Sequence, residues 1–193
     1  MSTFSLYFNL GLTHILDIQG YDHILFVVAL CALYMLRDWR KVLILITAFT
    51  IGHSITLALA TLDLIRVNAS LIEFLIPVTI FITATSNIFK GQQSSPNRVQ
   101  LNYGYALFFG LIHGMGFSNY LRSLLGREES ITVPLLGFNL GLELGQIVIV
   151  LVVLIAASIF VNILNVARRD WKIVISSAVA GIALTLMMDT KFW

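Results

Sequence analysis

The chain has 193 residues, of which 58% are hydrophobic and 11% are charged, and its formal net charge is +2. An ordinary soluble domain carries roughly 25% charged residues, so this composition excludes such a domain and indicates an integral membrane protein in contact with the lipid bilayer. There is no signature of nucleic-acid binding, and we expect no such partner. Long apolar runs joined by short loops predict that residues 1–193 form a single transmembrane helical domain.

Six apolar runs are long enough to cross a membrane, which takes about 20 mostly apolar residues in a helix. We therefore predict an all-α integral membrane protein, a compact bundle of about six transmembrane helices at residues 20–36, 41–61, 69–90, 101–120, 134–163 and 172–190. Residues 4–17 are amphipathic. They form either a re-entrant or interfacial helix, or an extension of the first span that is broken near Gly20.

Basic residues between the predicted spans are concentrated at one end of the bundle. That end holds Arg37, Arg40, Lys41, Lys90, Arg98, Arg168, Arg169 and Lys172, whereas the other holds Arg66, Arg122, Arg127 and Lys191. The positive-inside rule then places the first end in the cytoplasm and both termini outside. We predict a bacterial inner-membrane location with this topology.

The four histidines all lie in or beside apolar runs. His14 and His23 belong to a ten-residue stretch ahead of a long apolar run, whereas His53 and His113 lie inside the second and fourth predicted spans. A rise of about 1.5 Å per residue puts His53 and His113 roughly 18 Å from the cytoplasmic edge, in the outer half of the bilayer. His23 is within the first turn from the outside, and His14 is expected at the mouth of any site formed there.

Three carboxylates are expected at similar depths. Counting residues from the outside, Asp22 lies in the first turn of its span, Glu73 about one turn in and Glu143 roughly two and a half turns in. A charged side chain in hydrocarbon costs about 2.5–3.5 kcal/mol on insertion scales, so such groups are normally paired, turned inward or functional. These carboxylates are therefore expected to face the bundle interior.

The histidines and carboxylates together predict one intramembrane metal site, because neutral imidazoles and carboxylates suit ions such as zinc, nickel and cobalt. The residues that we predict to hold the ion are Asp22, His23, His53 and His113. Further ligands, or groups that orient the ligands, are His14, Glu73 and Glu143. The alternative is a polar network without metal, in which His53 bonds a neighbouring carbonyl.

Small and polar residues support convergence of the spans. Glycines recur at four-residue spacing at Gly110 and Gly114 and again from Gly137 to Gly145, which lets membrane helices approach closely. On the fifth span Asn139, Glu143 and Gln146 share one face. The same glycine-rich faces are candidates for a homo-oligomer contact.

The third span carries a second polar face. Glu73 and Asn87 are fourteen residues apart, close to four helical turns, and Thr83 and Ser86 border the same face. Their oxygens are arranged as an ion path toward the cytoplasm would need, although serine and threonine hydroxyls also bond to helix carbonyls. Pro77 is expected to kink this helix, and local unwinding there would free backbone carbonyls for coordination.

Together these motifs resemble the HupE/UreJ family of small membrane proteins, particularly its HupE/UreJ-2-like branch. The matching segments are residues 14–15, 20–26, 49–57, 73, 87, 109–117 and 138–146. The resemblance implies a nickel or cobalt permease that supplies hydrogenase and urease, with metal handling assigned to His14, Asp22, His23 and His113. One departure is that seven residues separate His14 from Asp22, where the family usually has five.

The leading hypothesis is therefore a divalent-metal permease for nickel or cobalt. A second hypothesis is an intramembrane zinc hydrolase, superficially like the alkaline ceramidases, in which three histidines hold zinc. In that case Asp22 or Glu143 would activate the bound water and Ser54 would stabilise an oxyanion. A third hypothesis is a membrane accessory or assembly protein without transport, whose histidines only pack.

Overall fold

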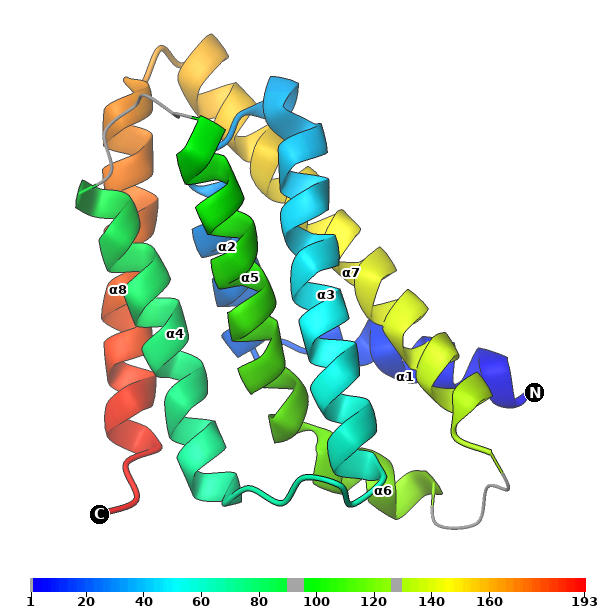
Figure 1. The fold of residues 1–193 in the computed structure, drawn as a ribbon. Helices are drawn as coiled ribbons and strands as arrows, with labels where there is room; N and C mark the ends of the chain where they lie inside the picture. Colours follow the sequence, from blue (N-terminus) through cyan, green and yellow to red (C-terminus); the bar gives the residue numbers. More distant parts are fainter. Residues whose placement is uncertain (1, 90–95, 126–129) are drawn as a thin grey trace.

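A computed structural model of the chain describes residues 2–89, 96–125 and 130–193. All regular structure in these ranges is helical, as predicted, and the longer helices run up and down beside one another (Figure 1). The α-helices are α1 (Thr3–Leu16), α2 (Asp22–Cys31), α3 (Trp39–Thr61), α4 (Ala69–Phe89), α5 (Pro96–Gly116), α6 (Ser118–Leu125), α7 (Thr132–Ser158) and α8 (Arg168–Asp189). A short 3-10 turn, η1 (Leu36–Asp38), precedes α3, and a π-helical turn, η2 (Ile159–Ile163), extends α7.

Four of the described helical segments are long and apolar enough to cross a membrane: Leu36–Thr61, Ala69–Phe89, Thr132–Ile163 and Arg168–Asp189. They match the second, third, fifth and sixth predicted spans and support an integral α-helical membrane protein. The predicted count of six is not confirmed. Helix α2 has only ten residues, and α5, whose first turns carry polar residues, is not among the four.

Helices α1 and α2 occupy the region for which the sequence allows either a separate short helix or one span broken near Gly20. Helix α1 has 14 residues and α2 has 10, so they are about 21 Å and 15 Å long and neither alone crosses a hydrocarbon core of about 30 Å. Residues 17–21 between them form a turn, which agrees with the predicted break near Gly20. The predicted first span, residues 20–36, is wrong in length, because its helix ends at Cys31.

Near the C-terminal end of α2, backbone carbonyls accept hydrogen bonds from side chains that are distant in the sequence. The Asn87 side-chain amide donates to the Ala29 carbonyl (2.7 Å), and the Arg168 guanidinium donates to the Leu33 carbonyl (3.0 Å). Carbonyls at the end of a helix have no partner within it and need such donors. The donors lie 58 and 135 positions along the chain, so no local pattern marks this helix end.

Glycines let two helix pairs touch backbone to backbone, as predicted. A β-carbon at Gly114 in α5 would overlap the carbonyl oxygen of His53 in α3, and one at Gly141 in α7 would overlap that of Phe8 in α1. These contacts place the α3 and α5 histidines close together. Both glycine-rich faces are thus occupied within one chain, and a homo-oligomer remains a prediction that needs another surface.

The basic end of the bundle is assembled as predicted for the residues that the structure describes (Figure 1). Arg168 Nη2 lies 3.6 Å from Asp38 Oδ2, and Lys172 Nζ donates to the Ile88 carbonyl at 3.3 Å, so the start of α8, the turn η1 and the end of α4 meet there. The predicted loop residues Lys90 and Arg127, and the side chain of Arg98, lie outside the described part. The cytoplasmic position of this end, and the outside position of the termini, remain predictions.

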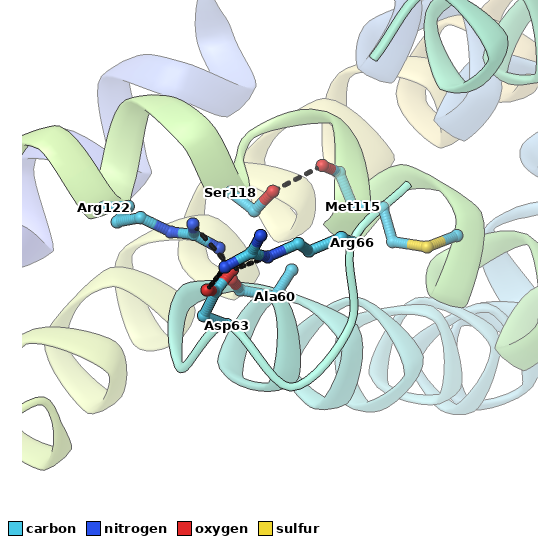
Figure 2. A network of polar contacts seen from close by, with 6 residues as sticks. All are labelled: Ala60, Asp63, Arg66, Met115, Ser118 and Arg122. Atoms are coloured by element: carbon cyan, nitrogen blue, oxygen red, sulfur yellow. Dashed lines mark hydrogen bonds and ion pairs between the residues drawn. The ribbon is translucent and has the colours of Figure 1, made fainter. Parts of the chain in front are cut away.

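An ion-pair network ties α6 to the end of α3 at the opposite end of the bundle (Figure 2). Asp63 accepts hydrogen bonds from Arg66 Nε and from Arg122 Nη1, each at 2.9 Å, and Arg122 Nη2 donates to the Ala60 carbonyl. We call these four residues the Asp63 network. It holds α6 against α3 just beyond the segment that carries His113.

Candidate metal centre

Four different helices bring the four histidines together. His14 is in the last turn of α1, His23 is the second residue of α2, and His53 and His113 lie in α3 and α5. The His23 ring is central, with centroid distances of 4.7 Å to His14, 5.3 Å to His113 and 6.1 Å to His53. We call these four residues the histidine group.

Three of these histidines offer ring nitrogens at metal-binding separation. One nitrogen each from His14, His23 and His53 lies within 4.8 Å of the others. An ion bound to imidazole nitrogens at about 2.1 Å holds them roughly 3.4 Å apart in a tetrahedral shell, so small ring rotations would complete this set. The sequence ranked His113 ahead of His14, whereas the geometry places His14 in the closest set.

Five ring nitrogens of the histidine group are buried without a hydrogen-bond partner among the described residues. They are Nε2 of His14, His23 and His113, and both nitrogens of His53. A buried polar atom left unpaired costs about 1–3 kcal/mol, so most such atoms in proteins find partners. Five at one place fit a site whose partner is an ion with a preference for imidazole nitrogen.

The rings of His23 and His113 are oriented by contacts at Nδ1, which leaves Nε2 of each ring available to bind an ion. His23 Nδ1 lies 2.9 Å from Asp22 Oδ1, and His113 Nδ1 lies 2.9 Å from the Phe109 carbonyl oxygen. In neutral rings Nδ1–H donates to these oxygens, and the lone pair is then on Nε2, as in many carboxylate–histidine–metal arrangements. Asp22 Oδ1 also accepts the backbone N–H of His23 at 2.8 Å, which fixes the carboxylate at the start of α2.

Aromatic rings cover the histidine group. The Phe117 ring centroid lies 4.0 Å from that of His14, and Phe138 lies 5.7 Å from His14 and 6.3 Å from His53. Phe117 and Phe138 stack on each other at 5.0 Å. Both residues lie in the sequence motifs, but their contact with the histidines is not predictable from the sequence, because a phenylalanine in an apolar run carries no distinguishing signal.

Glu143 and Ser54 form hydrogen bonds with groups other than the histidine rings. Glu143 Oε1 accepts a hydrogen bond from Thr47 (2.8 Å), six residues or about 9 Å before His53 along α3. The next polar residue on the same face, Gln146, accepts from Thr50 at 2.8 Å, so the predicted shared face is turned toward α3. The Ser54 hydroxyl donates to the Thr50 carbonyl at 2.6 Å, within its own helix.

Glu73 lies on a cleft that begins at Asp22. The cleft has a volume of about 200 Å³, and it is lined by Gln19, Gly20, Tyr21, Asp22, Glu73, Ile76, Pro77, Leu186 and Thr190. We call it the Glu73 cleft. Helix α4 continues through Pro77 without the predicted unwinding, but proline supplies no N–H for the Glu73 carbonyl four residues earlier. The residue that lines the cleft with its carboxylate therefore also has a backbone carbonyl that lacks its usual donor.

Comparison with known proteins identifies the family. The model of the family described as HupE / UreJ protein matches residues 1–191, nearly the whole chain. No curated protein and no solved structure matches the chain. The residues of the histidine group thus lie within the matched segment, and the protein belongs to the HupE/UreJ family.

Proposed function

We propose that the protein is a permease for a divalent transition metal of the nickel or cobalt type, and that the histidine group binds the ion in transit. The observation that carries this proposal is the set of five buried, unpartnered imidazole nitrogens. The family's link to nickel and cobalt handling supports the choice of metal. Imidazole also suits zinc, which remains an alternative ion.

Different residues would have different tasks in such a site. His14, His23 and His53 would bind the ion, His113 would supply a fourth nitrogen, and Asp22 would orient His23. Transport also requires that the ion can leave this site again. The Glu73 cleft, which shares Asp22 with the site, would admit the ion.

The first test is elemental analysis of the full chain, purified without chelator after growth with nickel or cobalt. We expect about one ion per chain. The same protein in proteoliposomes should load a fluorescent metal indicator on the far side. Stoichiometric metal without flux would refute the permease and leave the zinc hydrolase or the accessory protein as the function. Absence of metal would count against any metal site.

A matched pair of variants tests the site itself. We predict that His53→Ala loses most of the bound metal while the protein still inserts into the membrane. The neighbouring Ser54→Ala variant removes a hydroxyl that is bonded within its own helix, and it should keep both metal and flux. Unchanged metal content in His53→Ala would remove that residue from the site, and loss of a hydrolytic activity in Ser54→Ala would favour the enzyme.

A further inference from the structure

Three helices share a layered arrangement of aromatic side chains. His23 in α2 is followed by Phe26, and Phe49 and Phe109 precede His53 and His113 by four residues in α3 and α5. Each phenylalanine therefore lies about one helical turn from a histidine, on the side toward the basic end of the bundle. We call Phe26, Phe49 and Phe109 the phenylalanine layer.

The members of the phenylalanine layer are buried, and Phe26 contacts the other two. Phe26 and Phe49 are fully buried and Phe109 is 8% exposed, and the Phe26 centroid lies 4.8 Å from Phe49 and 6.0 Å from Phe109. The His113 ring rests against two members, at 5.2 Å from Phe26 and 5.1 Å from Phe49. A hydrophobic constriction of this kind blocks ions because it does not hold water.

A cavity of about 180 Å³ lies one more turn along the same helices. We call it the Asn87 cavity, and it is lined by Leu30, Leu33, Tyr34, Leu45, Ile82, Thr83, Ser86, Asn87, Asn102, Tyr105, Ala106 and Phe109. At about 30 Å³ per molecule this volume has room for several waters. Phe109 belongs both to its wall and to the phenylalanine layer.

The polar side of the Asn87 cavity presents oxygen lone pairs. The Thr83 hydroxyl donates its hydrogen to the Thr79 carbonyl (2.8 Å), so the lone pairs of that oxygen remain for an ion or its water. The Asn87 amide nitrogen is held by the Ala29 carbonyl at 2.7 Å, which leaves the amide oxygen as an acceptor. Ser86 adds a hydroxyl to the same wall.

We propose that the Asn87 cavity is a second station for the transported cation, which it binds in hydrated form through the neutral oxygens of Thr83, Ser86 and Asn87. The phenylalanine layer separates this station from the histidine group, so the ion exchanges imidazole ligands for water as it passes. Neutral oxygens bind a divalent ion weakly, which suits release. This inference rests on the proposed permease function, because an enzyme needs access from one side only.

Cobalt(II) is the probe for the test, since imidazole-bound cobalt absorbs visible light far more strongly than aquated cobalt. Equilibrium dialysis of the full chain with cobalt chloride should show two ions per chain, one tight and coloured and one weak with a water-like spectrum. The double variant Thr83→Val/Ser86→Ala should weaken only the second ion, by about tenfold. It should also lower cobalt flux into proteoliposomes about tenfold, because the station lies on the path.

Thr85→Val is the matched control, because Thr85 is on the same helix, its hydroxyl donates to the Phe81 carbonyl, and it does not line the cavity. Wild-type binding of the weak ion and wild-type flux in the double variant would overturn the second station. Altered retention of a lipid in the double variant, with the weak ion unchanged, would overturn it in favour of an acyl-chain pocket. Absence of the tight coloured ion in the wild type would instead refute the proposed function.

Discussion

The histidine group and the Asp63 network both join side chains from segments that are distant in the sequence, but they differ in how many of their polar atoms have partners. In the Asp63 network the Asp63 carboxylate accepts from two arginines, and Arg122 also caps a helix carbonyl (Figure 2). In the histidine group two rings have one partner each and five buried nitrogens have none.

This difference separates a structural contact from a binding site. Partially exposed ion pairs hold two segments together without a ligand, and in the Asp63 network only Arg122 Nε is buried without a hydrogen-bond partner among the described residues. Buried nitrogens without partners destabilise the empty protein, and they are retained where a ligand supplies the missing interaction. The histidine group should therefore lower stability until metal binds, whereas the Asp63 network should be indifferent to metal.

The largest expected effect comes from replacing His53, which has both ring nitrogens unpartnered and is fully buried. We predict that His53→Leu abolishes metal binding but raises the stability of the metal-free protein by on the order of 1 kcal/mol, because it removes two unsatisfied polar atoms at similar volume. Thermal unfolding in detergent, with and without metal, measures both effects. A less stable metal-free variant would mean that His53 has a structural partner.

A second large effect is expected at Gly114, where α5 touches the backbone of α3 beside His53. A side chain there would overlap the His53 carbonyl oxygen, so Gly114→Ala should push the two helices apart at a cost of about 1–3 kcal/mol and weaken metal binding. The matched control is Gly104→Ala in the same helix, where an added β-carbon meets nothing within 4 Å. Equal metal binding in the two variants would show that the metal site does not depend on the contact between α3 and α5 at Gly114.

An intermediate effect is expected at Asp22, which orients the His23 ring but does not belong to the closest group of possible ligands, His14, His23 and His53. Asp22→Asn keeps the shape of the side chain and can still accept the Nδ1–H of His23. It removes the negative charge that makes His23 Nε2 a stronger ligand for a metal ion. Changes to such orienting groups typically weaken metal affinity 10–100-fold. Isothermal titration with cobalt should show a loss in this range, and complete loss would instead make Asp22 a direct ligand.

Much of the fold follows from patterns within the chain. The predicted spans 41–61, 69–90, 134–163 and 172–190 agree with α3, α4, α7 with η2, and α8 to within a few residues, because each is a long apolar run bounded by polar residues. Convergence of the histidines was also predictable, since counting residues from the ends of the runs placed three of them at similar depth. Such counting uses only helix geometry and bilayer thickness.

The features that were not predicted depend on partners remote in sequence or on side-chain direction. Near the end of α2 at Cys31, Asn87 and Arg168 bond the carbonyls of Ala29 and Leu33, and nothing local in the apolar run indicates these two partners. Depth and the polar face shared with Asn139 and Gln146 predict Glu143 as a further ligand or orienting group, and the structure shows its hydrogen bond from Thr47, which neither pattern indicates. Depth counting gives position along a helix and says nothing of which neighbour a side chain meets.

The smallest effect is expected at Asp63, and it probes the structural side of the comparison. Asp63 has a left-handed backbone (φ 60°), which asparagine also tolerates, so Asp63→Asn removes the charge without straining the chain. We expect a slight fall in the unfolding temperature that becomes smaller at high salt, because surface ion pairs are screened. Metal binding should equal that of the wild type.

The hydrogen bonds between Arg66 and Asp63 also predict how the stability difference between the wild type and Asp63→Asn depends on pH. The hydrogen bonds from Arg66 hold the pKa of Asp63 below its usual value of 3.8. A carboxyl group with a lowered pKa contributes stability that is present above its unfolded pKa and is lost as pH falls through its folded pKa. The difference in unfolding temperature between the wild type and Asp63→Asn should therefore be constant near neutral pH and disappear only below about pH 4. A difference that changed with metal at neutral pH would show that the Asp63 network is coupled to the histidine group, and the contrast between the two regions would fail.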